Sequence, residues 1–172
     1  MINHNLLMYE LFDRTFSVNY GGKDWAVNYT EGDLYELAKK LNDSTTKYPI
    51  IWLQTGYTVQ RDRMKGTVKL SGCRIFFITL GDLNTRYKQR FENNYNDFLY
   101  KILLKFDKTI ERIPGINADL IDDITTYPLN DVAALMEGGR EQATIQDVWD
   151  AIQLTTDIEI TNECFSHLKI KI

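Results

Sequence analysis

The stretch Asp82–Pro114, DLNTRYKQRFENNYNDFLYKILLKFDKTIERIP, decides the fold of this chain. Its apolar residues recur at steps of three, four or one, which is the spacing of a single helical stripe. The members of this stripe are Tyr87, Phe91, Tyr95, Phe98, Leu99, Ile102, Leu103, Phe106, Ile110 and Ile113. The other face of the helix is polar and carries Arg86, Lys88, Gln89, Arg90, Asn93 and Asn94. We expect Asp82 and Asn84 to cap the start of this helix and Pro114-Gly115 to end it.

The predicted helix is unusually long. A helix of about 28 residues is about 42 Å long, more than twice the usual length. A long apolar stripe rich in aromatic side chains needs a broad apolar surface to pack against. We expect that surface to be a sheet.

Two segments before the helix read as strands. In KYPIIWLQ, residues 47–54, Pro49 suits a strand start, and the unbroken apolar run Ile50–Leu53 predicts a strand covered on both faces. Thr67–Leu80 predicts a second, longer strand whose alternation is clean at first and then lost. We expect Gly72 to mark a bulge or bend and the second half to lie centrally in the sheet.

Trp149–Thr161 predicts a further strand after the helix. Polar and apolar residues alternate along it, which is typical of an antiparallel strand with one wet side. The polar side carries Ala151, Gln153, Thr155, Asp157 and Glu159, and the apolar side Ile152, Leu154, Thr156, Ile158 and Ile160. The tail 167–172 alternates again and predicts an edge strand guarded by lysines.

A second, shorter helix is expected after Thr30, with Thr30 as its cap and Asp33 three residues on, as in a capping box. Its apolar stripe consists of Leu34, Leu37, Ala38 and Leu41. Residues 1–17 fit a short amphipathic helix, with a strand towards the end as the alternative. FSVNYGGKDWAVNY, residues 16–29, fits a hairpin that turns at Gly21-Gly22.

The segment 114–147 is less regular. Residues Ala118–Ile124 predict a short helix capped by Asn117. Pro128 interrupts regular structure after this helix, and residues 136–147 predict a loop. The whole pattern predicts an α+β fold: an antiparallel sheet with the long helix and the shorter helix packed on one face. We expect an N-terminal extension over residues 1–29 and a single α+β domain over residues 30–172.

Composition narrows the class of protein. A chain of 172 residues suits one domain, and a net charge of −4 argues against a general nucleic-acid binder, which needs a basic face. The sequence has no run of 18 apolar residues, so we expect no membrane span. The N-terminus does not resemble a signal peptide. Cys73 and Cys164 lack CxxC spacing, so we expect two reduced thiols.

Catalytic motifs are absent from the sequence. His4 and His167 lie near the termini, without the HxxxH or HExxH spacing of a zinc site. The glycine pairs lack the context of a phosphate-binding loop, and there is no GxSxG elbow. Asp119, Asp122 and Asp123 suit a helix face or solvated turn better than a metal site. We therefore expect no catalytic, cofactor-binding or metal-binding residue and no enzymatic activity.

Two charged segments are candidate assembly contacts. The first is GYTVQRDRMKG, residues 56–66, which predicts an exposed loop or the tip of a long hairpin. Its contact residues are Arg61, Arg63, Met64 and Lys65. The second is the loop Glu137, Gly138, Gly139, Arg140, Glu141 and Gln142. The cations suit an acidic partner or a phosphate backbone, and the alternative is a hairpin tip kept soluble by its charge.

The order of these elements resembles the tail-terminator, or tail-completion, proteins of tailed bacteriophages. The residues concerned are KYPIIWLQTG, then TVKLSGCRIFFITL, then the long amphipathic helix, a variable loop and WDAIQLTTDIEI. The strand that begins at Tyr48-Pro49-Ile50-Ile51 resembles the family's strand of a proline followed by apolar residues. The resemblance covers residues 30–113 and 149–162.

This resemblance implies a structural role in the virion for a protein made in the host cytoplasm. Members form homo-oligomeric rings, commonly six-fold, at the neck or head-proximal end of the tail. The ring stops tube growth and joins the tail to the head connector, with neighbouring connector and tail proteins as partners. Genome DNA passes through the lumen without specific binding, and the family implies neither catalysis nor a cofactor.

Two other classes of protein remain open from the sequence. One is a small α+β enzyme or ligand-binding domain, which needs a pocket with converging polar groups. The other is an adaptor subunit of a non-viral assembly.

Overall fold

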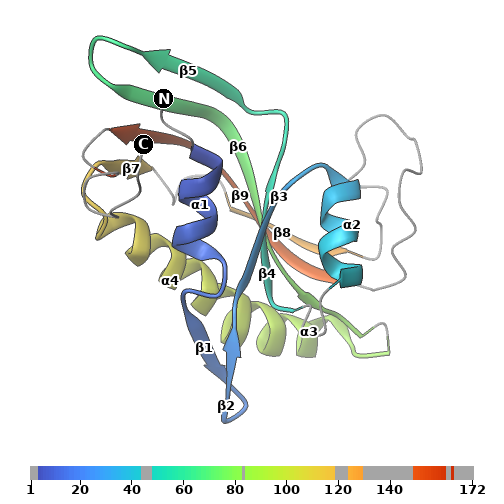
Figure 1. The fold of residues 1–172 in the computed structure, drawn as a ribbon. Helices are drawn as coiled ribbons and strands as arrows, with labels where there is room; N and C mark the ends of the chain where they lie inside the picture. The colour runs from blue at the N-terminus through green and yellow to red at the C-terminus, as the bar shows by residue number, and fades with distance from the viewer. Residues whose placement is uncertain are drawn as a thin grey trace.

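The computed structural model describes residues 4–43, 48–82, 84–118, 124–129, 149–161 and Cys164. These residues form an α+β fold in which helices cover a strongly twisted sheet (Figure 1). The elements in chain order are α1 (His4–Phe12), β1 (Ser17–Tyr20), β2 (Lys23–Ala26), β3 (Asn28–Gly32), α2 (Leu34–Asp43), β4 (Ile50–Gln54), β5 (Thr58–Asp62), β6 (Thr67–Leu80), α3 (Tyr87–Arg90), η1 (Phe91–Leu99), α4 (Tyr100–Glu111), β7 (Ile116–Ala118), β8 (Ile124–Leu129) and β9 (Trp149–Thr161). The predicted fold class is confirmed.

The main sheet is built around two long antiparallel strands, β6 and β9. Its order is β3-β4-β6-β9-β7, with β5 also pairing with β6 and β8 also pairing with β9. β6 is long enough to pair with both β4 and β5, and β9 with both β7 and β8. All of these pairs are antiparallel except β3 with β4, which is parallel. Every residue of β4 is buried, as its unbroken apolar run predicts.

A β-bulge at Gly72 interrupts the pairing of β6 with β9. Leu70 lies opposite Ile158 but Cys73 lies opposite Thr156, so β6 holds one extra residue. The extra residue places Leu70 and Cys73 on the same face of the sheet, which explains why the alternation in the sequence breaks here. Gly72 has a φ of +72°, a conformation that L side chains rarely adopt. The predicted bulge is therefore confirmed.

The long helix runs from Tyr87 to Glu111 as three consecutive segments, α3, the π-helical η1 and α4 (Figure 1). The buried members of the predicted stripe are Tyr95, Phe98, Leu99, Ile102, Leu103, Phe106 and Ile110. Phe106 packs on Phe77 of β6 with a ring-centroid distance of 5.3 Å and on Phe12 of α1 at 4.3 Å. The stripe therefore meets the sheet, as predicted.

The predicted start of this helix is wrong. Arg86 is the N-cap residue, without a side-chain cap, while the Asp82 carboxylate accepts hydrogen bonds from Asn84 N and Thr85 Oγ1 in the preceding turn. The Asp82 carboxylate accepts hydrogen bonds within the turn before the helix, so it does not cap the helix itself. The predicted polar face is also wrong for Arg90, which is buried because Asp150 pairs with it. The helix ends before Pro114, as predicted.

The shorter helix, α2, packs on the opposite face of the sheet from the long helix, which corrects the prediction of one shared face. Its predicted stripe is buried, and Leu34, Leu37 and Leu41 pack with Trp52 and Trp149. The long helix and α1 instead pack over the other face. The cause is β3: a parallel pair needs a crossover connection, and α2 is the crossover from β3 to β4.

The first 29 residues contain the expected helix and hairpin. α1 contributes Leu7, Met8, Leu11 and Phe12 to the core beneath the long helix. β1 and β2 form an antiparallel hairpin that turns at Gly21 and Gly22, both with positive φ. Thr30 lies in β3, so the predicted cap of α2 is wrong. The cap is Asp33, whose carboxylate accepts a hydrogen bond from Glu36 N at 2.9 Å. The division into an extension and a domain stays a prediction.

The irregular segment differs from its prediction. Ala118 lies in β7 and Ile124 in β8, so a helix spanning these positions is wrong; residues 119–123 are outside the described part of the chain. β9 is confirmed, with Asp157 and Glu159 exposed and Ala151 covered beneath α2. The predicted loop 136–147 and the tail 167–172 also lie outside the described residues.

Candidate assembly interface

The first candidate contact segment forms a projecting β-hairpin. We call residues 58–71 the arm: β5, a turn and the first residues of β6, which extend beyond the helices at one end of the sheet (Figure 1). All five residues of β5 are exposed, and among the described strands β5 pairs only with β6. The prediction of an exposed hairpin tip is confirmed. The arm can therefore meet another molecule with both of its sides.

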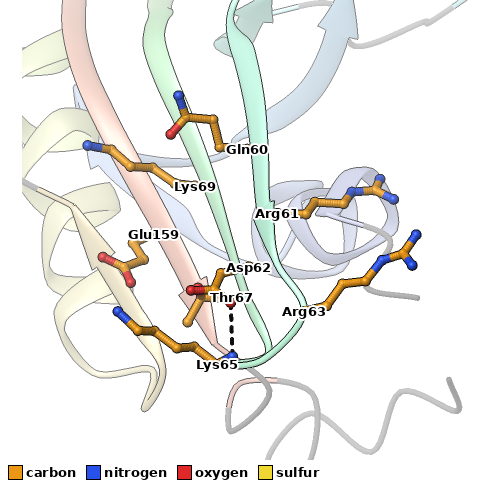
Figure 2. Close-up of a pocket in the computed structure, with 8 residues that line it drawn as sticks. All are labelled: Gln60, Arg61, Asp62, Arg63, Lys65, Thr67, Lys69 and Glu159. Carbon is orange, nitrogen blue, oxygen red and sulfur yellow. Dashed lines mark hydrogen bonds between the residues drawn. The ribbon is translucent and has the colours of Figure 1, made fainter.

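The carboxylate of Asp62 fixes the turn at the tip of the arm. Asp62 Oδ1 accepts hydrogen bonds from Met64 N at 2.9 Å and from Lys65 N at 3.1 Å, and Figure 2 shows the second of these. An aspartate that bonds the backbone two and three residues ahead fixes a turn. The neighbouring Arg61 and Arg63 form no ion pair with another described residue, and Met64 is 99% exposed. The tip therefore presents cations and one apolar side chain on a defined turn.

The two sides of the arm carry different residues. Arg61 lies opposite Val68, which shares the long-helix face of the sheet with Ile160. Gln60 lies opposite Lys69, which lies opposite Glu159 on the other face. Figure 2 shows the side chains of Arg61 and Arg63 extending from one side of the arm and those of Lys65, Lys69 and Glu159 from the other.

Asp157 holds the base of the arm at the bulge. Its carboxylate accepts hydrogen bonds from Gly72 N at 2.9 Å and Ser71 Oγ at 3.3 Å, and it pairs with Lys69 Nζ at 2.9 Å. The Gly72 N–H and the Lys69 ammonium favour the charged carboxylate and lower the pKa of Asp157. The hydrogen bond to Asp157 also raises the pKa of Lys69. Asp157 therefore ties the bulge of β6 to β9 at the base of the arm, and β6 pairs with β9 again from Leu70 to Thr67.

An open depression of about 620 Å³ lies along the arm. Its lining residues are Gln60, Arg61, Asp62, Arg63, Lys65, Thr67, Lys69 and Glu159 (Figure 2). Charges of both signs alternate in it, which suits contact with another polar surface. Within the described part of the chain, no three His, Cys, Asp or Glu side chains gather as metal ligands.

A second group of titratable side chains lies between α1 and β3. The Tyr29 hydroxyl donates to Glu31 Oε2 at 3.3 Å, and Glu31 N donates to the Tyr9 hydroxyl at 3.4 Å. Burial raises the pKa of Glu31, and burial together with the Glu31 charge raises the pKa of Tyr57 to about 12. The bond to Tyr9 ties α1 to β3, and we interpret the group as part of the packing.

The structure describes only one of the two predicted contact segments. Arg61, Arg63, Met64 and Lys65 lie together at the arm tip, whereas the loop 137–142 is outside the described residues. The sequence pattern does not predict Asp157 and Glu159 as contact residues. Their only signal in the sequence is their place on the polar side of the last strand, at the end nearest the arm.

Comparison with known proteins gives no family for this chain. No protein-family model matches it, and no curated protein matches its sequence. Among the described helices, none has the length and apolar character to cross a bilayer.

Proposed function

We propose that this chain is a structural subunit of a bacteriophage virion, forming a ring at the neck or head-proximal end of the tail. In this role it joins the tail to the head connector and allows genome DNA to pass. Its partners are further copies of itself and the neighbouring connector and tail proteins. The proposal includes no catalytic step and no cofactor.

The observation that carries this proposal is the arm. A closed ring of identical subunits needs two different, complementary surfaces on each subunit. The arm is a preformed projection whose cations at Arg61 and Arg63 have no ion-pair partner within the described chain. A long helix lying across an antiparallel sheet also agrees with the element order on which the resemblance to tail terminators rests.

The charge of the chain supports the passage of DNA without binding. The net charge is −4, and a protein that holds DNA through its phosphates needs a concentrated basic surface. The cations of the arm are interspersed with Asp62 and Glu159, so they do not form a continuous basic stripe. This distribution of charges favours contact with a protein over binding to DNA.

The test is deletion of the gene, followed by electron microscopy of the particles produced. A ring that stops tube growth and joins tail to head predicts tails of unregulated length and unjoined heads. Mass spectrometry of normal purified particles is expected to find the chain among the virion proteins. Normal tailed particles after deletion would disprove the role, as would flanking genes that encode no portal, tube or tape-measure protein.

A further inference from the structure

Positive charge is in excess on one side of the arm, and β9 places the exposed carboxylate of Glu159 on the other side. Arg61 lies on the face of the sheet that the long helix covers, and Arg63 extends to the same side as Arg61 (Figure 2). On the opposite side, Lys69 is paired with Asp157, whereas the exposed Glu159 forms no ion pair with another described residue. Lys65 also extends from this side, where the three carboxylates of Asp62, Asp157 and Glu159 outnumber the two cations Lys65 and Lys69. The two sides are therefore opposite in net charge.

We propose that the arm joins two copies of this chain head to tail, with Arg61 and Arg63 of one copy contacting Glu159 and Asp157 of the next. The inference rests on the ring assembly proposed above and names the surfaces that would form it. A second copy is the occupant that the charges favour, since each copy carries both halves of the contact.

The spacing of the charges fits such a contact. Arg61 lies near the end of β5 and Arg63 in the turn that follows it, and Asp157 and Glu159 are two residues apart on β9. Residues two apart on an extended strand are separated by about 7 Å, so Asp157 and Glu159 present two carboxylates within reach of two neighbouring arginine side chains. The planar guanidinium group also binds a carboxylate through two parallel hydrogen bonds.

The two patches lie on opposite sides of one arm, which determines the kind of assembly. A contact between different surfaces is heterologous, and its repetition gives a ring when the rotation closes. A two-fold contact centred on the Arg61 side would instead bring the like charges of two copies together.

The tip favours a protein partner over nucleic acid. Met64 is almost completely exposed between Arg63 and Lys65, and methionine and arginine are enriched in protein interfaces. A phosphate backbone offers no apolar surface for Met64. Asp62 and Glu159, which line the same depression, would also repel phosphate groups.

A charge swap tests the contact. We would compare the wild type, Arg61→Glu, Glu159→Arg and the double variant by sedimentation velocity at low ionic strength, where exposed ion pairs are strongest. Each single variant is expected to weaken self-association by about tenfold or more, and the double variant to recover most of the loss. Asp97→Arg, an exposed change on η1, is the matched control and should leave association unchanged.

Cross-linking tests the direction of the contact independently. A chain with Arg63→Cys mixed with a chain with Glu159→Cys is expected to form a disulfide-linked dimer, while neither variant alone should do so. Dimers of Arg63→Cys alone would indicate a two-fold contact and overturn the proposal. A wild type that stays monomeric at low salt, or single variants that associate normally, would also overturn it.

Two further outcomes separate this inference from the proposed function. If the wild type forms rings and the charge-swap variants form them equally well, the arm contact is disproved and the virion role is unaffected. Charge-dependent self-association by a chain that is missing from tailed particles would remove the virion role instead. Double-stranded DNA binding that is lost in Arg61→Glu would assign the arm to nucleic acid and overturn the proposal.

Discussion

The guanidinium group of Arg90 and the carboxylate of Asp150 form an ion pair inside the protein, joining the first turn of the long helix to the start of β9. Both residues are buried, at 5% and 0% exposure, and Arg90 Nε lies 3.2 Å from Asp150 Oδ2. Asn94 Nδ2 also donates to Asp150 Oδ2 at 2.6 Å, and the Tyr95 hydroxyl lies 3.5 Å from Oδ1. The pair therefore fixes where the helix begins on the sheet.

Removing one member of this pair is expected to destabilise the protein strongly. Asp150→Ala leaves the Arg90 guanidinium buried without a partner, which costs about 3–5 kcal/mol. Urea unfolding followed by circular dichroism measures this cost. Asp97→Ala on the exposed side of η1 is the matched control, with an expected change within about 0.5 kcal/mol. A loss below about 1 kcal/mol in Asp150→Ala would show that water reaches the pair.

The pair also explains why residue 81 is glycine. A Cβ at Gly81 would lie 2.8 Å from Arg90 Nη2 and 3.1 Å from Asp150 Oδ1. Because the ion pair holds both groups in place, Gly81→Ala must displace it, at an expected cost of about 1–3 kcal/mol. In an Arg90→Met background the shorter side chain leaves room, so the cost of Gly81→Ala should shrink. Equal costs in both backgrounds, measured by urea unfolding, would contradict this explanation.

The sequence predicts the parts of this fold that local patterns encode. The stripe from Tyr95 to Ile110 follows from helical spacing, and the bulge follows from Gly72 at the point where strand alternation breaks. Gly21-Gly22 between two β-prone pieces is sufficient to predict the first hairpin. In each case the signal lies within a short stretch of chain.

The errors involve partners that are distant in sequence. Asn28–Gly32, NYTEG, lacks an apolar strand pattern, yet it becomes β3 because Ile50–Gln54 pairs with it in parallel. Without β3 no crossover is expected, so the sequence pattern predicts α2 on the wrong face of the sheet. Arg90 reads as a surface residue until Asp150, 60 residues later, is brought against it.

The candidate interface divides in the same way. The cations at Arg61 and Arg63 are visible in the sequence because they cluster within three residues. Their counterpart, Glu159, becomes apparent only when the register of β6 with β9 places it opposite Lys69 at the root of the arm. Local spacing in the sequence cannot identify a charged residue whose neighbours are set by the pairing of distant strands.

Glu31 is expected to make stability depend on pH. Its carboxyl is half-buried, and burial raises its pKa from the ordinary value of 4.5, while the Tyr29 hydrogen bond opposes the rise. The folded state therefore holds the proton more tightly than the unfolded state. This contribution to stability is fully present below pH 4.5 and is lost as pH rises through the folded pKa.

Glu31→Gln removes the titrating carboxyl and with it this loss of stability at higher pH. The free energy of unfolding of the variant, relative to wild type, should therefore be greater at pH 7 than at pH 4. Because the carboxyl is partly exposed to water, we expect a gain below about 1 kcal/mol. Unfolding free energies measured across this pH range test the expectation, with exposed Glu92→Gln as the matched control. A relative stability of Glu31→Gln that stays constant with pH, or falls as pH rises, would contradict the raised pKa.

Asp157 is expected to hold the bulge of β6 against β9 at the base of the arm. Asp157→Ala removes the acceptor of Gly72 N and Ser71 Oγ and the partner of Lys69. The arm should then open more often, because the bulge has lost its cross-strand bonds. We expect the Gly72 amide to exchange its hydrogen severalfold faster, and trypsin to cleave after Arg61 and Arg63 severalfold faster.

The neighbouring change Glu159→Ala is the control for this effect, since Glu159 accepts no hydrogen bond from the bulge. The lowered pKa of Asp157 gives a second measurement on the unmodified chain. Acid that protonates Asp157 should loosen the arm as the variant does, so the protection of the Gly72 amide falls as pH drops through the lowered pKa. Exchange at Gly72 that is unchanged in Asp157→Ala, or that follows the exchange of the whole core, would show that the pairing of β6 alone fixes the arm.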